Sequence, residues 1–296
     1  MSKKPYLSVV VTTRNDDHGG DLLKRTICFV EGVYHQAKKF PLEIELIIVE
    51  WNPPSDRPLL KDVLPKPPAD CNVTLRYIIV PEDLHKTYRM SDSLPLFQMI
   101  AKNVGIVRAE GEFVLCTNID LLFSDKLFQF LSQKSLKTGN FYRAIRSDIP
   151  KEVMEIDDFQ GQIKFAKENV MARLGKRKGH EYLFGIPDFV YGFTTTATVL
   201  NWVFKYLLSK FYEEEHFEML SLDTHACGDF TLMSKSDWLK IDGYPELDLY
   251  SIHVDSMGLV AARALGINQV ILEPDCCSYH IYHADGWESF KDSPID

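Results

Sequence analysis

The chain has 296 residues, of which 45% are hydrophobic and 25% are charged, a composition typical of a globular protein and not of a disordered or fibrous one. Its 33 lysines and arginines stand against 42 aspartates and glutamates, which gives a formal net charge of −9. The chain therefore lacks the excess of cations that neutralises a nucleic-acid backbone, and we expect no nucleic-acid partner. The length allows two average domains or one large α/β domain.

The sequence predicts a cytoplasmic protein without a secretory signal or a transmembrane segment. The longest uncharged run, residues 189–204, has 16 residues and includes four threonines and an asparagine, which makes it too short and too polar to cross a bilayer. The six cysteines form no C-x-x-C pair, so we interpret them as buried thiols in a reducing compartment. Peripheral membrane association stays open.

The first part of the chain alternates strands and helices. Residues 7–13 (LSVVVTT) are typical of a strand buried on both faces, and residues 20–38 follow with helical spacing. Residues 43–49 and 73–80 predict two more strands on either side of a proline-rich loop at 52–68.

A further helix and strand complete this pattern. Apolar residues recur at helical spacing over residues 93–108, Gly111 ends the helix, and residues 113–117 form the next strand. The alternation predicts an open α/β sheet with right-handed crossovers, in which ligands bind at the carboxyl ends of the strands.

The second part of the chain is less regular. Residues 150–185 change from acidic to basic with weak periodicity, which predicts a peripheral insertion. Beyond it we expect helices at 200–217, 236–241 and 254–265 and strands at 229–234 and 270–272.

Polar residues follow four of the apolar runs. They are Thr12, Thr13, Arg14, Asn15 and Asp16; Glu50 to Asn52; Thr117 to Asp120; and Ser278 to His280, beyond the last predicted strand. Any one of them has an ordinary explanation, such as a helix cap. Their recurrence after successive strands favours one shared crevice, because the carboxyl ends of parallel strands meet at one edge of a sheet.

The tripeptide Asn118-Ile119-Asp120 indicates a more specific chemistry. In an extended segment, a one-residue spacer places Asn118 and Asp120 on the same face. Such a pair can bind a ribose and a hard divalent cation such as Mg²⁺ or Mn²⁺, which prefers carboxylate and phosphate oxygens. A cation shared in this way would let an acidic protein hold a diphosphate.

In order and spacing, the sequence resembles the inverting GT-A glycosyltransferases, which use nucleotide sugars. The segments that carry the resemblance are residues 7–16, 46–51, 101–120 (the A-R-N-x-G helix and D-x-D strand), 228–246 (the acceptor-side segment) and 253–266 (the E-D-x-D-L helix), followed by His280 and His283. It implies an α/β GT-A fold, a Rossmann-like mixed sheet flanked by helices. It also implies one large domain (1–296), with a nucleotide-sugar-binding half at 1–120 and an acceptor-side half at 121–296 that contains the insertion near 150–185.

The resemblance also implies an activity and its residues. The chain would transfer a sugar, with inversion, from a nucleoside-diphosphate donor to a hydroxyl of a glycan or lipid-linked acceptor. The implied donor-binding residues are Thr12, Thr13, Arg14, Asn15, Glu50, Lys102, Asn103, Asn118, Ile119 and Asp120. Asp255 would be the catalytic base. Asp120 with His280, His283 or both would hold a divalent cation, Mn²⁺ or Mg²⁺.

Departures from the family pattern keep alternatives open. Asn118 replaces the first aspartate of D-x-D, and Met257 replaces an aspartate after Asp255. A non-catalytic nucleotide-sugar-binding protein is therefore a second hypothesis. A nucleotidyltransferase is a third hypothesis. The pair Gly19-Gly20 is the only feature that favours it, and no lysine-containing glycine-rich loop follows the first strand.

Single residues have structural alternatives as well. Glu50 is equally well explained as a solvated strand end, and we favour a solvated helix face for Lys102. Asp255 could complement a helix N-terminus, and the two histidines could be structural. The insertion, together with residues 191–198, is a candidate lid on the acceptor side, with a surface loop as its alternative.

Overall fold

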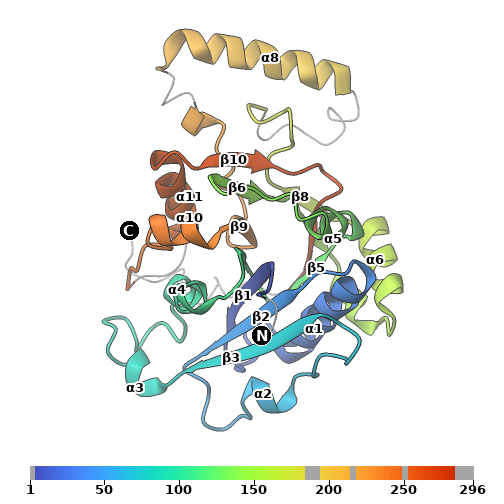
Figure 1. Cartoon of the computed structure of the whole chain (residues 1–296), viewed down its shortest axis with the longest axis vertical. Helices are drawn as coiled ribbons and strands as arrows, with labels where there is room; N and C mark the ends of the chain where they lie inside the picture. The colour runs from blue at the N-terminus through green and yellow to red at the C-terminus, as the bar shows by residue number, and fades with distance from the viewer. Residues whose placement is uncertain (1–3, 184–193, 214–217, 249–252, 284–296) are drawn as a thin grey trace.

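The computed structural model of the chain describes residues 4–183, 194–213, 218–248 and 253–283, in which two sheets are flanked by helices (Figure 1). The larger sheet has seven strands in the order β10-β6-β9-β4-β1-β2-β3. Its strands are β1 (Leu7–Thr13), β2 (Ile44–Trp51), β3 (Val73–Val80), β4 (Phe113–Thr117), β6 (Asn140–Arg143), β9 (Phe230–Ser234) and β10 (Asn268–Ile271). Strands β1 to β4 are parallel to one another, and β9 runs antiparallel between β4 and β6.

The predicted strands of the first half are confirmed. Every residue of β1, β2 and β4 is buried, as expected of β-branched runs in a parallel sheet that is covered on both faces. The fold is a single α/β domain with a mixed sheet flanked by helices.

Two helical layers cover the larger sheet. Helices α1 (Leu22–Lys39) and α5 (Asp125–Ser132) pack on one face, in a core that includes Val9 and Phe128. Helices α4 (Gln98–Arg108), α10 (Lys235–Lys240) and α11 (Val254–Ala264) pack on the other, in a core that includes Val10 and Trp238. The shorter helices are α2 (Leu60–Val63), α3 (Glu82–His85) and the 3₁₀ helix η1 (Lys151–Glu155).

Helix α4 begins five residues later than the spacing predicts. Pro95 explains this difference, because a proline disfavours helical backbone in the residue before it and has no N–H for a helix interior. The proline-rich loop also contains α2, which the sequence does not predict.

The smaller sheet has the order β5-β11-β7-β8, and the sequence predicts none of its four strands. Its strands are β5 (Leu121–Phe123), β7 (Arg146–Ile149), β8 (Ala172–Leu174) and β11 (Ser278–Ile281). Strand β11 lies between β5 and β7, so the prediction that residues 278–280 lie beyond the last strand is wrong. A run of four residues with serine and histidine in it shows no β pattern, and its partners are distant in the sequence.

Much of the predicted insertion is regular structure. It contains η1, α6 (Phe159–Glu168) and β8, and α6 buries Phe159, Ile163 and Ala166 against the smaller sheet. Lys176 is buried, and its Nζ donates to the Leu220 carbonyl oxygen at 2.7 Å. These contacts fix the described part of the segment to the domain; residues 184–185 and 191–193 of the candidate lid lie outside the described residues.

Helix α8 (Thr194–Phe211) lies at one end of the molecule, apart from the two sheets (Figure 1). It begins six residues earlier than the predicted helix at 200–217. In the part of the chain that the structure describes, no helix combines the length and the apolar character needed to cross a membrane.

Candidate functional site

The polar residues after β1, β2 and β4 meet at one edge of the larger sheet. Thr13 and Glu50 are register partners at the ends of β1 and β2, and Val10 pairs with Cys116 of β4. This part of the sequence prediction is confirmed, since parallel strands bring their carboxyl ends together.

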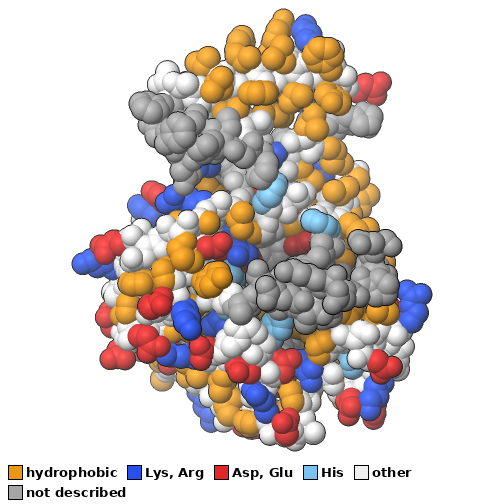
Figure 2. All heavy atoms as spheres, turned by 180° about the vertical axis from the view of Figure 1, so that it is seen from behind, with side chains coloured by type: hydrophobic (Ala, Val, Ile, Leu, Met, Phe, Trp, Pro, Cys, Tyr) orange, Lys and Arg blue, Asp and Glu red, His pale blue; other side chains and the backbone are white. Residues whose placement is uncertain are grey.

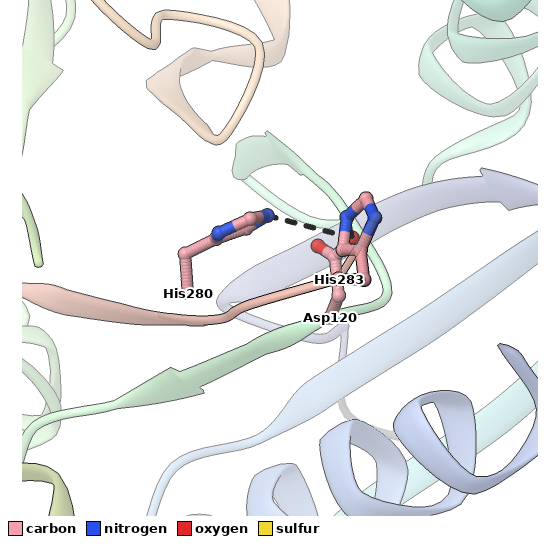
Figure 3. A group of neighbouring side chains, drawn as sticks. All are labelled: Asp120, His280 and His283. Carbon is pink, nitrogen blue, oxygen red and sulfur yellow. Dashed lines mark hydrogen bonds and ion pairs between the residues drawn. The ribbon is translucent and has the colours of Figure 1, made fainter. Parts of the chain in front are cut away.

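At this edge, Asp120 faces two histidines from the end of the described chain (Figure 3). The Nε2 atoms of His283 and His280 lie 3.1 and 3.7 Å from Asp120 Oδ2. One ligand atom from each of the three residues can be chosen so that all lie within 4.8 Å of one another. A carboxylate with two imidazoles is a donor set for divalent transition metals.

The ionised form of Asp120 is strongly favoured although the side chain is buried. Arg25, from α1, places Nη1 3.2 Å from Asp120 Oδ2. Burial alone would raise the pKa of the Asp120 carboxyl, but the neighbouring imidazoles of His280 and His283 hold it well below its usual range. Asp120 Oδ1 is buried without a hydrogen-bond partner among the described residues, so one oxygen stays available for a ligand.

His280 connects this cluster to a second group of charges. Its Nδ1 lies 3.2 Å from Asp148 Oδ1 on the neighbouring strand β7. Burial lowers the pKa of His280, but Asp120 and Asp148 outweigh it and raise the pKa to about 9. Arg146 bridges Asp148 and Asp229, at 2.6 and 2.9 Å. The network thus extends from Asp120 to the start of β9.

Asn118, Ile119 and Asp120 lie between β4 and β5, and the backbone bends at Ile119 and Asp120 where the sequence predicts an extended segment. Ile119 is buried in the core beneath the sheet edge. Asn118 donates to Asp229 Oδ1 and accepts hydrogen bonds from Gln98 at 2.9 Å and Lys102 at 3.0 Å. Asn118 therefore connects the end of β4 with α4 and with the residue before β9.

Lys102 is wholly buried, so its interpretation as a solvated helix face is wrong. Its Nζ donates to Asn118 Oδ1 and to the Gly228 carbonyl oxygen, the latter at 2.7 Å. Burial lowers the pKa of the Lys102 ammonium below its ordinary value, and the opposing effects of Cys116, Asp255 and Asp229 offset this only in part. A buried cation at the edge of an acidic protein can attract a diphosphate.

Asp255 belongs to the same neighbourhood. A Cβ atom built on Gly228 would lie 2.9 Å from Asp255 Oδ2 and 3.9 Å from Lys102 Nζ. Asp255 stands in the first turn of α11, where its Oδ1 accepts the Ser256 N–H at 2.8 Å, and it is partly exposed. The helix cap itself is His253, without a side-chain capping bond. Asp255 thus presents its second oxygen beside Gly228.

Glu50 is buried, so the alternative of a solvated strand end is wrong. Both of its carboxylate oxygens accept the Leu60 N–H, at 3.1 and 3.0 Å, and thereby fix the proline-rich loop to the end of β2. Burial raises the pKa of Glu50 above its ordinary value of 4.5, partly offset by this hydrogen bond.

The free energy of unfolding of Glu50→Gln is expected to increase relative to that of wild type as the pH rises above about 4.5. A carboxyl group with a raised folded-state pKa binds more protons in the folded than in the unfolded state, so its ionisation removes stability as pH increases. Glutamine keeps an acceptor for Leu60 without ionising. Urea unfolding between pH 4 and 7 measures the difference, and a stability difference that is independent of pH would contradict the assignment.

The other predicted donor residues hold the surrounding loops. Asn15 donates to the Pro58 carbonyl oxygen at 3.0 Å, and Arg14 pairs with Asp16 at 3.6 Å. Thr12 Oγ1 is buried and has no hydrogen-bond partner in the described ranges, whereas Thr13 Oγ1 donates to the Arg14 carbonyl oxygen at 3.4 Å.

Asn103 connects α4 to the predicted acceptor-side segment. Its amide donates to the Tyr244 carbonyl oxygen and accepts the Tyr244 N–H, both at 2.8 Å. Gly243, at φ +74°, makes this close approach possible, because a Cβ there would lie 2.3 Å from Asn103 Oδ1. Asn103 therefore joins the two parts of the chain that carry the resemblance.

The sequence does not single out Arg25, Arg146 or Asp148 as members of this network. Arg25 occupies a core position of α1, three residues after buried Leu22, and a cation at such a position is a usable signal. Arg146 and Asp148 lie on a four-residue strand whose neighbours no sequence pattern gives.

No protein-family model matches the chain, and no curated protein sequence matches it. Solved structures do resemble it. One is the mannosyltransferase PcManGT from Pyrobaculum calidifontis, in complex with GDP-Man and Mn²⁺, at 12% identity and a TM-score of 0.51 over 98% of this chain. Another is S. aureus TarS 1-349, in complex with UDP-GlcNAc, at 13% identity and a TM-score of 0.51 over 96% of this chain.

This chain covers 60% of each of those two chains. At such low identity the likeness establishes the fold and does not establish an activity. The predicted fold, the mixed α/β architecture of nucleotide-sugar glycosyltransferases, is thereby confirmed.

Proposed function

We propose that this chain transfers a sugar, with inversion, from a nucleoside-diphosphate sugar to an acceptor hydroxyl. The observation that carries the proposal is the buried carboxylate of Asp120, which meets His280 and His283 at the carboxyl edge of the sheet. Both structural neighbours have nucleotide sugars bound, and one also has Mn²⁺. Ligands of open α/β sheets bind at this edge.

The residues at this edge fit a divalent cation. Asp120 Oδ1 is a buried oxygen without a hydrogen-bond partner among the described residues, and the two histidines supply nitrogen ligands. We assign Asp120 and one or both of His280 and His283 to the cation. When bound, a cation of this kind stabilises negative charge on a leaving diphosphate.

The chain's own residues would supply the rest of the chemistry. Asp255 takes the proton of the acceptor hydroxyl. At the same time the hydroxyl oxygen bonds to the anomeric carbon, and the bond from that carbon to the diphosphate breaks. Lys102 adds positive charge near the diphosphate and fixes Asn118 and Gly228 in place. The acceptor is a glycan or a lipid-linked hydroxyl.

A donor-turnover assay with GDP- and UDP-sugars tests the function. The protein is incubated with each nucleotide sugar and Mn²⁺, with and without added acceptor glycans, and the released nucleotides are separated by chromatography. We expect release of nucleoside diphosphate that falls in EDTA, since slow donor hydrolysis accompanies transfer when water replaces the acceptor.

Two outcomes would contradict the proposal. Formation of nucleoside triphosphate and sugar 1-phosphate when pyrophosphate is added to the nucleotide sugar would identify a nucleotidyltransferase. Donor binding measured by calorimetry, without turnover under any of these conditions, would identify a non-catalytic nucleotide-sugar-binding protein.

A further inference from the structure

Helix α8 exposes an apolar face. Its residues Val199, Trp202, Val203, Tyr206 and Leu207 recur at i, i+3, i+4, i+7 and i+8, the spacing of one side of a helix; we call these five residues the outer face of α8. All five are exposed, Val199 by 55% and Trp202 by 65%. Figure 2 shows hydrophobic side chains along the helix at the end of the molecule. A contiguous apolar surface of this kind marks an interaction site.

The opposite side of α8 faces the domain and makes polar contacts with it. Asn201 donates to the Gly179 carbonyl oxygen at 2.8 Å and accepts the Tyr182 N–H at 3.0 Å. Ala197, on the same side, is the buried residue of the helix. The helix is therefore attached through its inner side and carries its apolar residues outward, the reverse of an ordinary surface helix.

The charge and side-chain chemistry of α8 narrow the choice of partner. Within Thr194–Phe211 the charged residues are both lysines: Lys205 lines a pocket with Glu181 and Glu218 on the inner side, and Lys210 lies on the outer side, eleven residues after Val199. Trp202 and Tyr206 stack at 5.9 Å, and Lys210 Nζ lies 5.1 Å from the Tyr206 ring. Tryptophan, tyrosine and lysine beside aliphatic residues are typical of helices that lie in the headgroup region of a membrane.

We propose that the outer face of α8 binds the surface of an anionic phospholipid bilayer, with the helix axis in the plane of the membrane. The aliphatic and aromatic side chains enter the boundary between headgroups and acyl chains, and Lys210 contacts lipid phosphates. A second copy of this chain fits less well, because pairing two α8 helices brings together only cations, which lipid phosphates instead neutralise.

Vesicle co-sedimentation tests this surface without donor or acceptor, so its result is independent of the proposed sugar transfer. The full chain is mixed with vesicles of phosphatidylcholine, with or without phosphatidylglycerol. We expect binding to the anionic vesicles, and at least about a tenfold weaker binding for Trp202→Glu/Leu207→Glu. Lys210→Gln is expected to lose about fivefold in affinity on anionic vesicles, whereas Lys205→Gln, on the inner side of the helix, should bind like wild type.

Val107→Glu/Leu239→Glu is the matched control, since these residues are 59% and 49% exposed on α4 and α10. This variant is expected to bind vesicles like wild type, and thermal unfolding checks that both double variants fold. The proposal is overturned if wild type and Trp202→Glu/Leu207→Glu bind vesicles equally. It is also overturned if wild type ignores vesicles but sediments as a dimer that this variant abolishes.

Discussion

Asp255→Asn is expected to reduce sugar transfer by at least about a hundredfold, with near-normal folding and donor binding. Asparagine preserves the shape of the side chain and the acceptor for the Ser256 N–H but cannot take a proton at neutral pH. The loss should therefore fall on kcat, with little change in the donor KM. Steady-state kinetics and donor calorimetry measure the two effects separately.

Asp125→Asn is the matched control for Asp255→Asn, because Asp125 also stands in the first turn of a helix, α5. Both substitutions remove a favourable interaction with a helix dipole worth about 0.3–1 kcal/mol, but only one should abolish transfer. If Asp255→Asn transfers sugar at the wild-type rate, the base lies elsewhere, and Asp229 or His253 would be the next candidates. Asp229 is the poorer base, since Arg146 holds it in an ion pair.

Asp120→Asn is expected to weaken Mn²⁺ binding by at least about a hundredfold and to make the residual activity insensitive to EDTA. The substitution removes the charge that the two histidines and Arg25 surround. Calorimetric titration of Mn²⁺ without donor gives a readout that does not depend on activity.

A second variant guards against misfolding of Asp120→Asn, in which buried Arg25 loses its carboxylate partner. His283→Gln leaves the Arg25–Asp120 pair intact and should still reduce Mn²⁺ affinity by about 10-fold or more. His35→Gln, on the exposed surface of α1, is the control for adventitious binding by histidine. Unchanged Mn²⁺ affinity in both Asp120→Asn and His283→Gln would exclude the assigned ligands.

The sequence predicts the part of the fold whose signals are local. The continuous apolar runs of β1, β2 and β4 require burial on both faces, and a parallel sheet then places Thr13, Glu50 and Asp120 at one edge. For this reason the candidate site could be located from strand ends alone.

The remaining features depend on contacts between distant residues. Strand β11 becomes a strand because β5 and β7 flank it, and Lys102 is buried because Asn118 and Gly228 accept its hydrogen bonds. A lysine on an isolated helix has the same sequence pattern whether it is solvated or enclosed. The outward-facing α8 is likewise invisible to periodicity, which gives the apolar side of a helix but not what that side faces.

The position of β11 also fixes when the site can form during synthesis. The parallel strands β1 to β4 pair with one another within residues 7–117, so this half can fold while the rest of the chain is still being made. The larger sheet cannot be completed until β9 enters between β4 and β6, and Asp120 meets His280 only after β11 has entered between β5 and β7. Pairing of strands that are distant in the sequence slows folding. A cation that needs all three ligands would thus select and stabilise finished molecules over nascent ones.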